Sequence, residues 1–305
     1  MAELAGDQRD GRRAIIDMPM ARATLGALLV LLLPFATWSL EGHAVTSAQG
    51  QPGTGGPPLT VVSLNMARKS TFDEVAGEIS TLVDRHAVDV FLFQEVQQDP
   101  GAPRPIAHEL AETLGFYCLF QTTDHWKDGG SQGLAILSRY PIENAAVIPL
   151  KHFDLRFRQR NRIGLAATLV TPLGPVRVVN VHLDSRINTD ERLAQLSGVL
   201  ESEADDEGPS IVGGDFNTGD FKWLTRWFPI PLAARQGDAV RQLMSAHEFG
   251  TPFAQDGATF KYLGLRLDWI FTKGLQADSW GIDRIDFSDH RAIWLTMSST
   301  LAPPN

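Results

Sequence analysis

Beyond residue 58, short runs of β-branched and apolar residues alternate with segments whose apolar residues recur every three or four positions. The short runs predict strands and the longer segments predict amphipathic helices. The predicted strands are Leu59–Asn65, Val88–Gln94, Phe116–Phe120, Gly133–Ser138, Ile163–Thr171, Val176–His182, Ile211–Asp215, Leu267–Phe271 and Ala292–Thr296. The predicted helices are Phe72–Arg85, Ile106–Leu114, Thr189–Leu200 and Asp238–Ala246.

This order of elements predicts an α/β (α+β) fold. Some neighbouring strands are joined by turns as short as residues 171–175, and others are separated by a helix, which indicates mixed sheets. About 240 residues are many for one sheet and typical of two packed sheets with helices outside.

Residues 23–38 form an apolar run without a charge, and Arg12, Arg13 and Arg22 precede it. A basic flank and a short apolar run are typical of a signal peptide, whereas a membrane-spanning helix needs about 20 apolar residues. An uncleaved membrane anchor is the alternative. Both readings predict an extracytoplasmic protein, which is secreted, periplasmic or tethered to the membrane through residues 23–38.

Residues 45–58 are rich in Gly, Pro, Ser and Gln and carry no charge, which predicts a flexible linker. The predicted organisation is therefore a signal peptide or anchor at 1–44, a linker at 45–58, a catalytic domain at 59–298 and a tail at 299–305.

Composition narrows the function classes. The chain is 43% hydrophobic and 21% charged, a balance that excludes disordered, collagen-like, coiled-coil and polytopic membrane classes. The single cysteine, Cys118, excludes a disulfide framework and a cysteine-based zinc site. The net charge is −9, and residues 59–305 keep −8 of it. This charge disfavours a broad nucleic-acid-coating surface but leaves a local basic groove open.

Polar residues follow or precede the predicted apolar strands, at the strand ends where open α/β sheets bind ligands. A single Asp or Asn there is more often a turn former. Taken together, carboxylates, asparagines and two histidines supply oxygen ligands for Mg²⁺ or Mn²⁺ and groups that transfer protons near neutral pH. The residues concerned are Asn65, Glu95, His182, Asp215, Asn217, Asp268, Asp289 and His290.

The segments around these residues resemble the endonuclease/exonuclease/phosphatase superfamily, which includes deoxyribonuclease I-like and sphingomyelinase-like phosphoesterases. Seven motifs occur in the order found in that superfamily: SLNM, FQEV, GLAILSRYPI, VNVHLDS, GGDFNT, RLDWIF and SDHRAI. The resemblance implies a four-layer sandwich, with two mixed sheets face to face and helices outside, and metal-dependent hydrolysis of a phosphoester.

The resemblance also implies the metal site and the catalytic base. Glu95 corresponds to the principal metal ligand, with Asn65 beside it and Asp289 as a further candidate. Mg²⁺ is the expected ion, and Mn²⁺ is the alternative. His290 corresponds to the general base that accepts a proton from the attacking water, and Asp268 corresponds to the carboxylate that orients it.

The remaining matched residues correspond to groups that contact the phosphate. Asp215 and Asn217 would position the water and the phosphate, and His182 would bind the phosphate or assist the leaving oxygen. Deoxyribonuclease I-like and sphingomyelinase-like members carry this histidine, whereas the exonuclease III-like branch has Asn there. His182 therefore directs the interpretation away from abasic-site repair.

Four arginines lie two residues apart: Arg156, Arg158, Arg160 and Arg162. If this segment is extended, all four project from one face and form a positive stripe in an acidic domain. Arg162 lies where family members commonly carry an arginine near the scissile phosphate. The alternative is a solvated edge strand whose charges discourage self-pairing.

The sequence thus predicts an exported, metal-dependent phosphodiesterase. A nucleic-acid substrate is preferred over a phospholipid or a small phosphoester. The aromatic residues Trp223, Trp227 and Phe228 favour the lipid alternative unless they are core residues. A catalytically inactive binding module is disfavoured because the motif residues are intact. No sequence feature indicates a protein partner.

Overall fold

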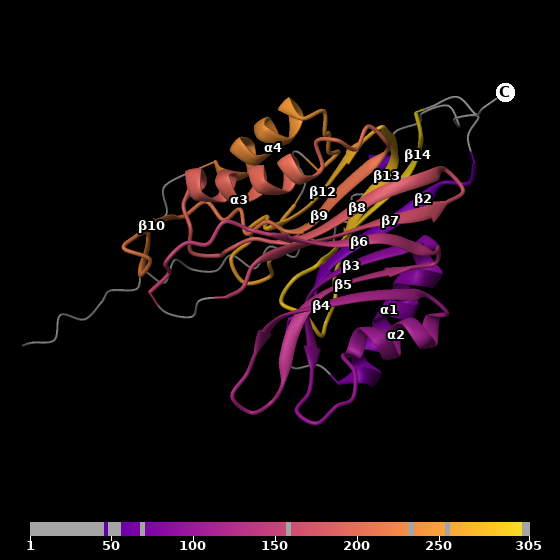
Figure 1. Ribbon diagram of the computed structural model, residues 1–305, viewed down its shortest axis with the longest axis horizontal. Helices are drawn as coiled ribbons and strands as arrows, with labels where there is room; N and C mark the ends of the chain where they lie inside the picture. The colour runs from indigo at the N-terminus through magenta and orange to yellow at the C-terminus, as the bar shows by residue number, and fades with distance from the viewer. Residues whose placement is uncertain are drawn as a thin grey trace, which may run out of the picture. The chain divides into compact units, whose positions relative to one another are not determined.

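The computed structural model describes residues 46–47, 56–67, 71–156, 160–230, 235–253 and 257–300. These residues form two mixed β-sheets packed face to face, with two helices on the outer face of each sheet (Figure 1). The predicted fold class, a four-layer α/β sandwich, is confirmed.

The larger sheet has seven strands in the order β1-β13-β14-β2-β3-β5-β4. Only the β2–β3 pair is parallel among these strands. The strands are β1 (Thr46–Ser47), β2 (Leu59–Asn65), β3 (Val90–Gln98), β4 (Tyr117–His125), β5 (Ser131–Ser138), β13 (Leu275–Asp283) and β14 (Ala292–Ser299).

The smaller sheet has five strands in the order β12-β9-β8-β7-β6, and its β8–β9 pair is parallel. A separate hairpin pairs β10 with β11. The strands are β6 (Ile142–Pro149), β7 (Ile163–Thr171), β8 (Gly174–His182), β9 (Ser210–Asp215), β10 (Lys222–Leu224), β11 (Phe228–Ile230) and β12 (Asp268–Lys273).

The helices are α1 (Phe72–His86), α2 (Ile106–Leu114), α3 (Thr189–Ser202) and α4 (Gln236–Ala246). Thr71 begins α1 with a capping box, in which its hydroxyl accepts from the Glu74 backbone while the Glu74 carboxylate accepts from the Thr71 backbone. Ile79 of α1 and Leu110 of α2 pack against Phe91 on the outer face of the larger sheet. The α3 and α4 helices bury their apolar residues against the smaller sheet.

The two sheets share an apolar core with one polar crosslink inside it. Asn180 of β8 donates hydrogen bonds to the carbonyls of Phe93 and Ala135, both at 2.9 Å. The Asn180 Oδ1 atom accepts from Gln94 Nε2 at 2.8 Å. Because Gln94 lies in β3 and Asn180 in β8, this crosslink fixes how the ends of the two parallel strand pairs face one another.

All nine predicted strands and four predicted helices are present; β2, β7 and α2 have the predicted bounds, and the others are shifted. Strand β3 begins at Val90 rather than Val88 because the Asp89 carboxylate accepts from the Thr60 backbone, which makes residues 88–89 part of the connection. Strands β6 and β13 and the β10–β11 hairpin were not predicted. Strand β6 has mostly exposed residues and β13 has many polar ones, so neither shows a clear apolar run.

The predicted domain begins where β2 begins, at Leu59, and β14 ends at Ser299. The predicted signal peptide or anchor at 1–44 lies outside the described residues, as does most of the predicted linker. Within that linker, however, Thr46–Ser47 pairs with Ser279 and Trp280 of β13 as strand β1. Among the described residues, no helix is both long enough and apolar enough to cross a bilayer.

Candidate active site

The ends of the parallel strands from both sheets meet at one rim of the sandwich. In the larger sheet, Asn65 at the end of β2 is in register with Gln94, directly before Glu95. In the smaller sheet, Asp215 at the end of β9 is in register with both His182 and Asp268. The strand registers therefore bring together five of the residues that the sequence predicted.

The Asp215 carboxylate lies at the centre of this group. Its Oδ2 atom accepts a hydrogen bond from Asn65 Nδ2 at 2.9 Å. The same oxygen lies 3.5 Å from His182 Nε2 and 3.9 Å from His290 Nε2. Asp215 is 2% exposed, so these contacts lie in a largely dehydrated environment. Asp215 therefore connects the polar ends of both sheets.

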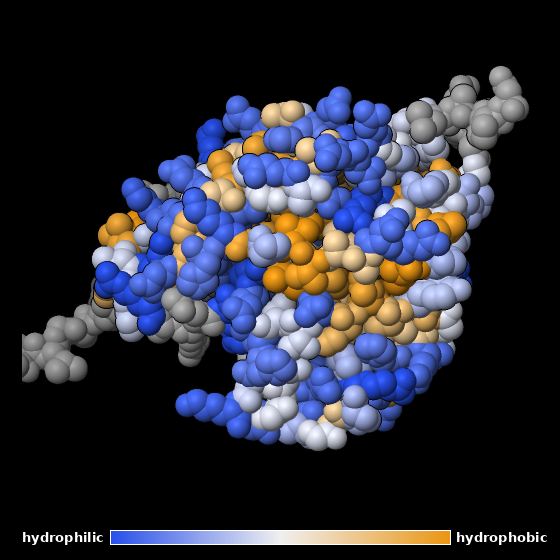
Figure 2. Space-filling model, in the orientation of Figure 1, coloured by the Kyte–Doolittle hydropathy of each residue, from blue (hydrophilic) through white to orange (hydrophobic). Residues whose placement is uncertain are grey.

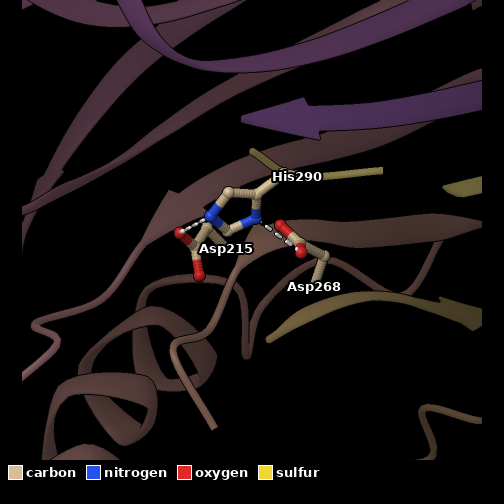
Figure 3. Close-up of side chains that lie close together, drawn as sticks. All are labelled: Asp215, Asp268 and His290. Atoms are coloured by element: carbon tan, nitrogen blue, oxygen red, sulfur yellow. Dashed lines mark hydrogen bonds and ion pairs between the residues drawn. The ribbon is translucent and has the colours of Figure 1, made fainter. Parts of the chain in front are cut away.

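The His290 ring lies between two carboxylates, Asp268 on its Nδ1 side and Asp215 on its Nε2 side (Figure 3). The distance from Nδ1 to Asp268 Oδ2 is 2.8 Å. The backbone N–H of His290 donates to Ser288 Oγ, whose hydroxyl donates to the Asn65 carbonyl at 2.6 Å. The ring and the backbone of this histidine are thus both held in place, as a proton-transfer group requires.

The two carboxylates change the proton affinity of the site. Burial favours the neutral imidazole, but the charge of Asp268 and its hydrogen bond outweigh burial and raise the pKa of His290 to about 10. Burial and the neighbouring Asp268 charge raise the pKa of Asp215 to about 6, although His290 and Asn65 oppose this shift. In the absence of metal, His290 is therefore an imidazolium at neutral pH.

Glu95 and Asn217 both have left-handed backbone conformations, with φ of 53° and 51°. The register between β3 and β5 shifts between Phe93 and Val96, so Glu95 lies at a β-bulge. Asn217 donates from its backbone to Asp215 Oδ1 and from its side chain to the Leu183 carbonyl. Bulges and positive φ values are common where a strand end redirects a functional side chain.

The rim opens into a cavity of about 570 Å³. The predicted metal ligands Asn65, Glu95 and Asp289 all line it, together with the His290 side chain. Carboxylate and amide oxygens are the ligands that Mg²⁺ and Mn²⁺ prefer. The donor set present in this cavity therefore fits a hard divalent cation.

A second arrangement of donors lies deeper. One ligand atom each from Asp215, Asp268 and His290 falls within 4.8 Å of the others. The Oδ1 atom of Asp268 is buried and has no hydrogen-bond partner among the described residues. Asp268 and His290 are hydrogen-bonded to each other, whereas Glu95, Asn65 and Asp289 line the main cavity.

The arginines do not form the stripe that an extended segment would give. Arg156 has a φ of 63°, and no strand includes the described residues between 151 and 162. Arg160 lies 3.8 Å from Asp124, and Arg162 Nε donates to Asp184 Oδ1 at 3.4 Å. Arg158 lies outside the described residues. Carboxylates thus lie beside two of the positive charges, and the described residues of this segment do not form the extended strand that the stripe requires.

Arg162 nevertheless lies at the site. It lines a crevice too narrow to hold a water molecule, together with Glu95 and His182. Its side chain is 11% exposed, and Asp184 holds the guanidinium. Gln195 in turn donates to Asp184 Oδ2 at 2.9 Å. Arg162 therefore lies in the same lining as Glu95 and His182.

The sequence analysis missed several residues at the site. Trp126, Asp128 and Gln97 line the main cavity, and no motif pointed to them. Arg192 is 1% exposed and donates to the Asp184 and Phe216 carbonyls, which follow His182 and Asp215 in the chain. An arginine on the apolar side of a predicted helix was the available signal for Arg192.

The other histidines of the sequence lie away from this group wherever the structure describes them. His86 bonds Asp283 and stacks on Trp294. His108 lies edge-on to Phe120. His125, His152 and His247 are exposed. None of these five residues lines the main cavity.

The structure is a four-layer sandwich with carboxylates, asparagines and a carboxylate-bound histidine at the strand ends. This combination defines a phosphoesterase fold whose site suits metal binding and proton transfer. The model of the endonuclease/exonuclease/phosphatase family matches residues 62–290. The chain belongs to this family, whose members are metal-dependent hydrolases of phosphodiester substrates such as nucleic acids.

Individual relatives are more distant. The UPF0294 protein of Vibrio campbellii is 29% identical over 122 residues, which are 40% of this chain and 39% of that protein. The chain thus spans about two fifths of the length of the curated relatives it matches.

Solved structures of the family share the fold. The endonuclease/exonuclease/phosphatase from Beutenbergia cavernae has a TM-score of 0.65 at 22% identity, covering 81% of this chain and 73% of its own. The human Nocturnin catalytic domain, solved with a bound sulfate anion, has a TM-score of 0.59 at 17% identity. The match covers 85% of this chain and 98% of the Nocturnin domain.

Proposed function

We propose that this protein hydrolyses a phosphodiester by direct attack of water, with Mg²⁺ as the ion and Mn²⁺ as the alternative. The observation that carries the proposal is the position of His290, which is held by Asp268 on Nδ1 and faces the cavity lined by Glu95, Asn65 and Asp289. Family members act on such substrates, and the donor set of the cavity suits a hard cation.

Each residue has a role that follows from its contacts. His290 accepts the proton of the attacking water at Nε2, because Asp268 already occupies Nδ1. Asp215 keeps His182 and His290 on either side of one carboxylate oxygen. A divalent cation bound at Glu95 would supply positive charge that stabilises the phosphorane and disfavours the protonated form of His290.

His182 and Arg162 act on the phosphate itself. Both line the crevice beside Glu95, and both offer nitrogen donors to non-bridging oxygens or to the leaving oxygen. The side-chain amide of Asn217 donates a hydrogen bond to the Leu183 carbonyl, so its main effect is to fix the loops after β8 and β9.

A nucleic-acid substrate is our preferred choice. It is consistent with the substrates of the family and with a cavity large enough for a nucleotide. The acidic net charge makes binding depend on the site itself, where Arg162 and a bound cation would provide the positive charge.

A phospholipid headgroup is the second candidate, favoured by one observation. Leu224, Trp227 and Phe228 on the β10–β11 hairpin are 44%, 55% and 68% exposed. Figure 2 shows apolar surface at the end of the molecule where Figure 1 places β10. Exposed aromatic residues on a hairpin suit a lipid interface, where an apolar ring and a wet polar edge are both satisfied.

A substrate panel tests both candidates. The full chain would be incubated with Mg²⁺, Mn²⁺ or EDTA and with plasmid DNA, single-stranded DNA, RNA, sphingomyelin or inositol phosphates. Glu95→Ala and His290→Ala should abolish most turnover, and His247→Ala at an exposed position is the matched control. Hydrolysis of no substrate with any metal would refute the proposal, and full activity in His290→Ala would refute the mechanism.

We also propose that the protein is exported, since the basic and apolar pattern of residues 12–38 is typical of an export signal. The N-terminus of the mature protein tests this. A product that begins after residue 38, or an intact product in the membrane fraction, would support export. An intact soluble product in the cytoplasm would contradict it.

A further inference from the structure

The wall of the main cavity contains one large aromatic side chain among the described residues, Trp126. It lies in the turn between β4 and β5, far in sequence from every family motif that supplies the polar residues. Asn65, Glu95, Asp289 and His290 line the same cavity. A ligand phosphate at these polar groups would therefore place its substituents within the same space as the indole.

The turn holds Trp126 in a defined position. The Trp126 backbone N–H donates to the Gly130 carbonyl at 2.8 Å, and its carbonyl accepts from Gly129 at 3.1 Å. The Gly130 N–H donates to Asp128 Oδ1 at 3.0 Å. Because three hydrogen bonds close the turn, the start of the side chain is fixed before any ligand binds.

The indole also packs directly on the backbone of Gly130. A Cβ atom placed on Gly130 would lie 2.7 Å from Trp126 Cε3 and 3.1 Å from Cζ3. Only glycine leaves room for the ring in this position. The residue is half-buried and lines the main cavity.

The rest of the cavity wall is polar apart from Ala67, and three of its residues are acidic. Glu95, Asp128 and Asp289 contribute carboxylates, and Gln97 contributes an amide. A long acyl chain would find few apolar partners in this cavity. A nucleobase suits it better, because one face stacks on an indole while its polar edge meets hydrogen-bonding groups or water.

We propose that Trp126 is a stacking platform for a nucleobase attached to the scissile phosphate, and that it thereby selects nucleotides over phosphodiesters without a ring. This inference rests on the proposed phosphodiesterase function. It adds a base-binding subsite that none of the motif residues provides.

The test compares two substrates that differ only in their bases. One is the dinucleoside phosphate dTpdT, and the other has tetrahydrofuran abasic residues on both sides of the same phosphate. Product is measured by chromatography with Mg²⁺ present. For Trp126→Ala we expect kcat/KM on dTpdT to fall by about 5-fold to 150-fold, with the value on the abasic compound within about twofold of wild type.

Three further variants of the full chain complete the test. Trp126→Phe keeps a ring and should recover most of the rate on dTpdT. Gly130→Ala retains Trp126 but should lower that rate, because the added methyl group displaces the ring. Tyr117→Ala, at an exposed aromatic position of β4 outside the lining of the main cavity, should match wild type on both compounds.

An equal loss on both compounds in Trp126→Ala would show that the residue supports the site generally, and would overturn the inference. An unchanged rate on both would overturn it as well. If wild type hydrolyses neither compound, the proposed function fails instead, so the two failures are distinguishable.

Discussion

Replacing Asp268 with Asn tests the arrangement around His290 most sharply. Asp268 is 0% exposed, and its Oδ2 lies 2.8 Å from His290 Nδ1. Its backbone is fixed by pairing with Asp215 and by a hydrogen bond to Thr259 Oγ1. Asparagine has nearly the same shape, so the substitution removes the charge and changes little else.

The size of the effect follows from the proton affinity of the ring. The pKa of His290 rises from 6.5 to about 10, and among the groups that raise it Asp268 is the largest. This shift corresponds to on the order of 5 kcal/mol in favour of the protonated ring. Removing the Asp268 charge therefore lowers the pKa of His290, and the ring also loses the carboxylate that orients it.

Two changes in kinetics should appear together. We expect kcat/KM at the pH optimum to fall by about 10-fold to 100-fold, as is usual when the partner of a catalytic group is removed. The acidic limb of the pH profile should move to lower pH, because a less basic imidazole loses its proton earlier. The assay is hydrolysis of bis(4-nitrophenyl) phosphate in Mg²⁺ across pH 5 to 10.

The control is Asp278→Asn, because Asp278 accepts from Ser298 in β14, outside the lining of the main cavity, and should leave the profile unchanged. Metal affinity should also be unchanged in Asp268→Asn. An unaltered rate, or an acidic limb that moves upward, would refute the reasoning. A metal affinity that falls in parallel with the rate would instead make Asp268 a metal ligand.

Three further predictions concern stability and reactivity. In EDTA, the urea concentration at the unfolding midpoint of wild type should fall as pH rises from about 6.5 to 10. The raised pKa of His290 stabilises the folded state fully below pH 6.5, the unfolded value, and this stabilisation is lost above about pH 10, the folded value. His290→Ala should lack this dependence on pH. Asn180→Ala should lower the free energy of unfolding by about 3 kcal/mol in urea titrations, because it leaves buried partners without hydrogen bonds, whereas the exposed Gln276→Ala should change it by less than about 0.5 kcal/mol. Cys118 should stay unmodified by a disulfide reagent at pH 8 until urea unfolds the protein, because burial raises the pKa of its thiol to about 12.

Each of these has a clear contrary result. A midpoint urea concentration that increases as the pH is raised above 7 would contradict the charge arrangement at His290. Equal stabilities of the Asn180→Ala and Gln276→Ala variants would show that the polar crosslink between the sheets contributes little. Rapid modification of Cys118 in the folded protein would show that its thiol is accessible.

The order of the apolar runs predicted two packed sheets with helices outside, and the motifs supplied the four-layer sandwich. The runs also end at polar residues that would be costly inside a core. Asn65, His182 and Asp215 were identifiable on this basis, and β2 and β7 match their predicted bounds. The motifs placed Glu95, but the sequence gives no sign of the bulge that redirects it.

Other features depend on tertiary contacts that no local pattern encodes. Trp126 lines the cavity only because the turn between β4 and β5 reaches the ends of β2 and β3. The arginine spacing suggested a free positive face, yet Asp124 and Asp184 lie opposite Arg160 and Arg162. Asp184 is part of a motif, but its partner Arg162 lies 22 residues away in the chain, and the sequence does not indicate that the two residues pair.

The most direct test of the account measures initial rates on bis(4-nitrophenyl) phosphate against Mg²⁺ concentration, for wild type and Glu95→Gln. This simple phosphodiester makes the result independent of the natural substrate. We predict no turnover by wild type in EDTA, saturable activation by Mg²⁺, and a half-saturating concentration at least about tenfold higher in Glu95→Gln. Full activity of EDTA-treated wild type, or identical activation of both proteins, would contradict a metal-dependent site at Glu95.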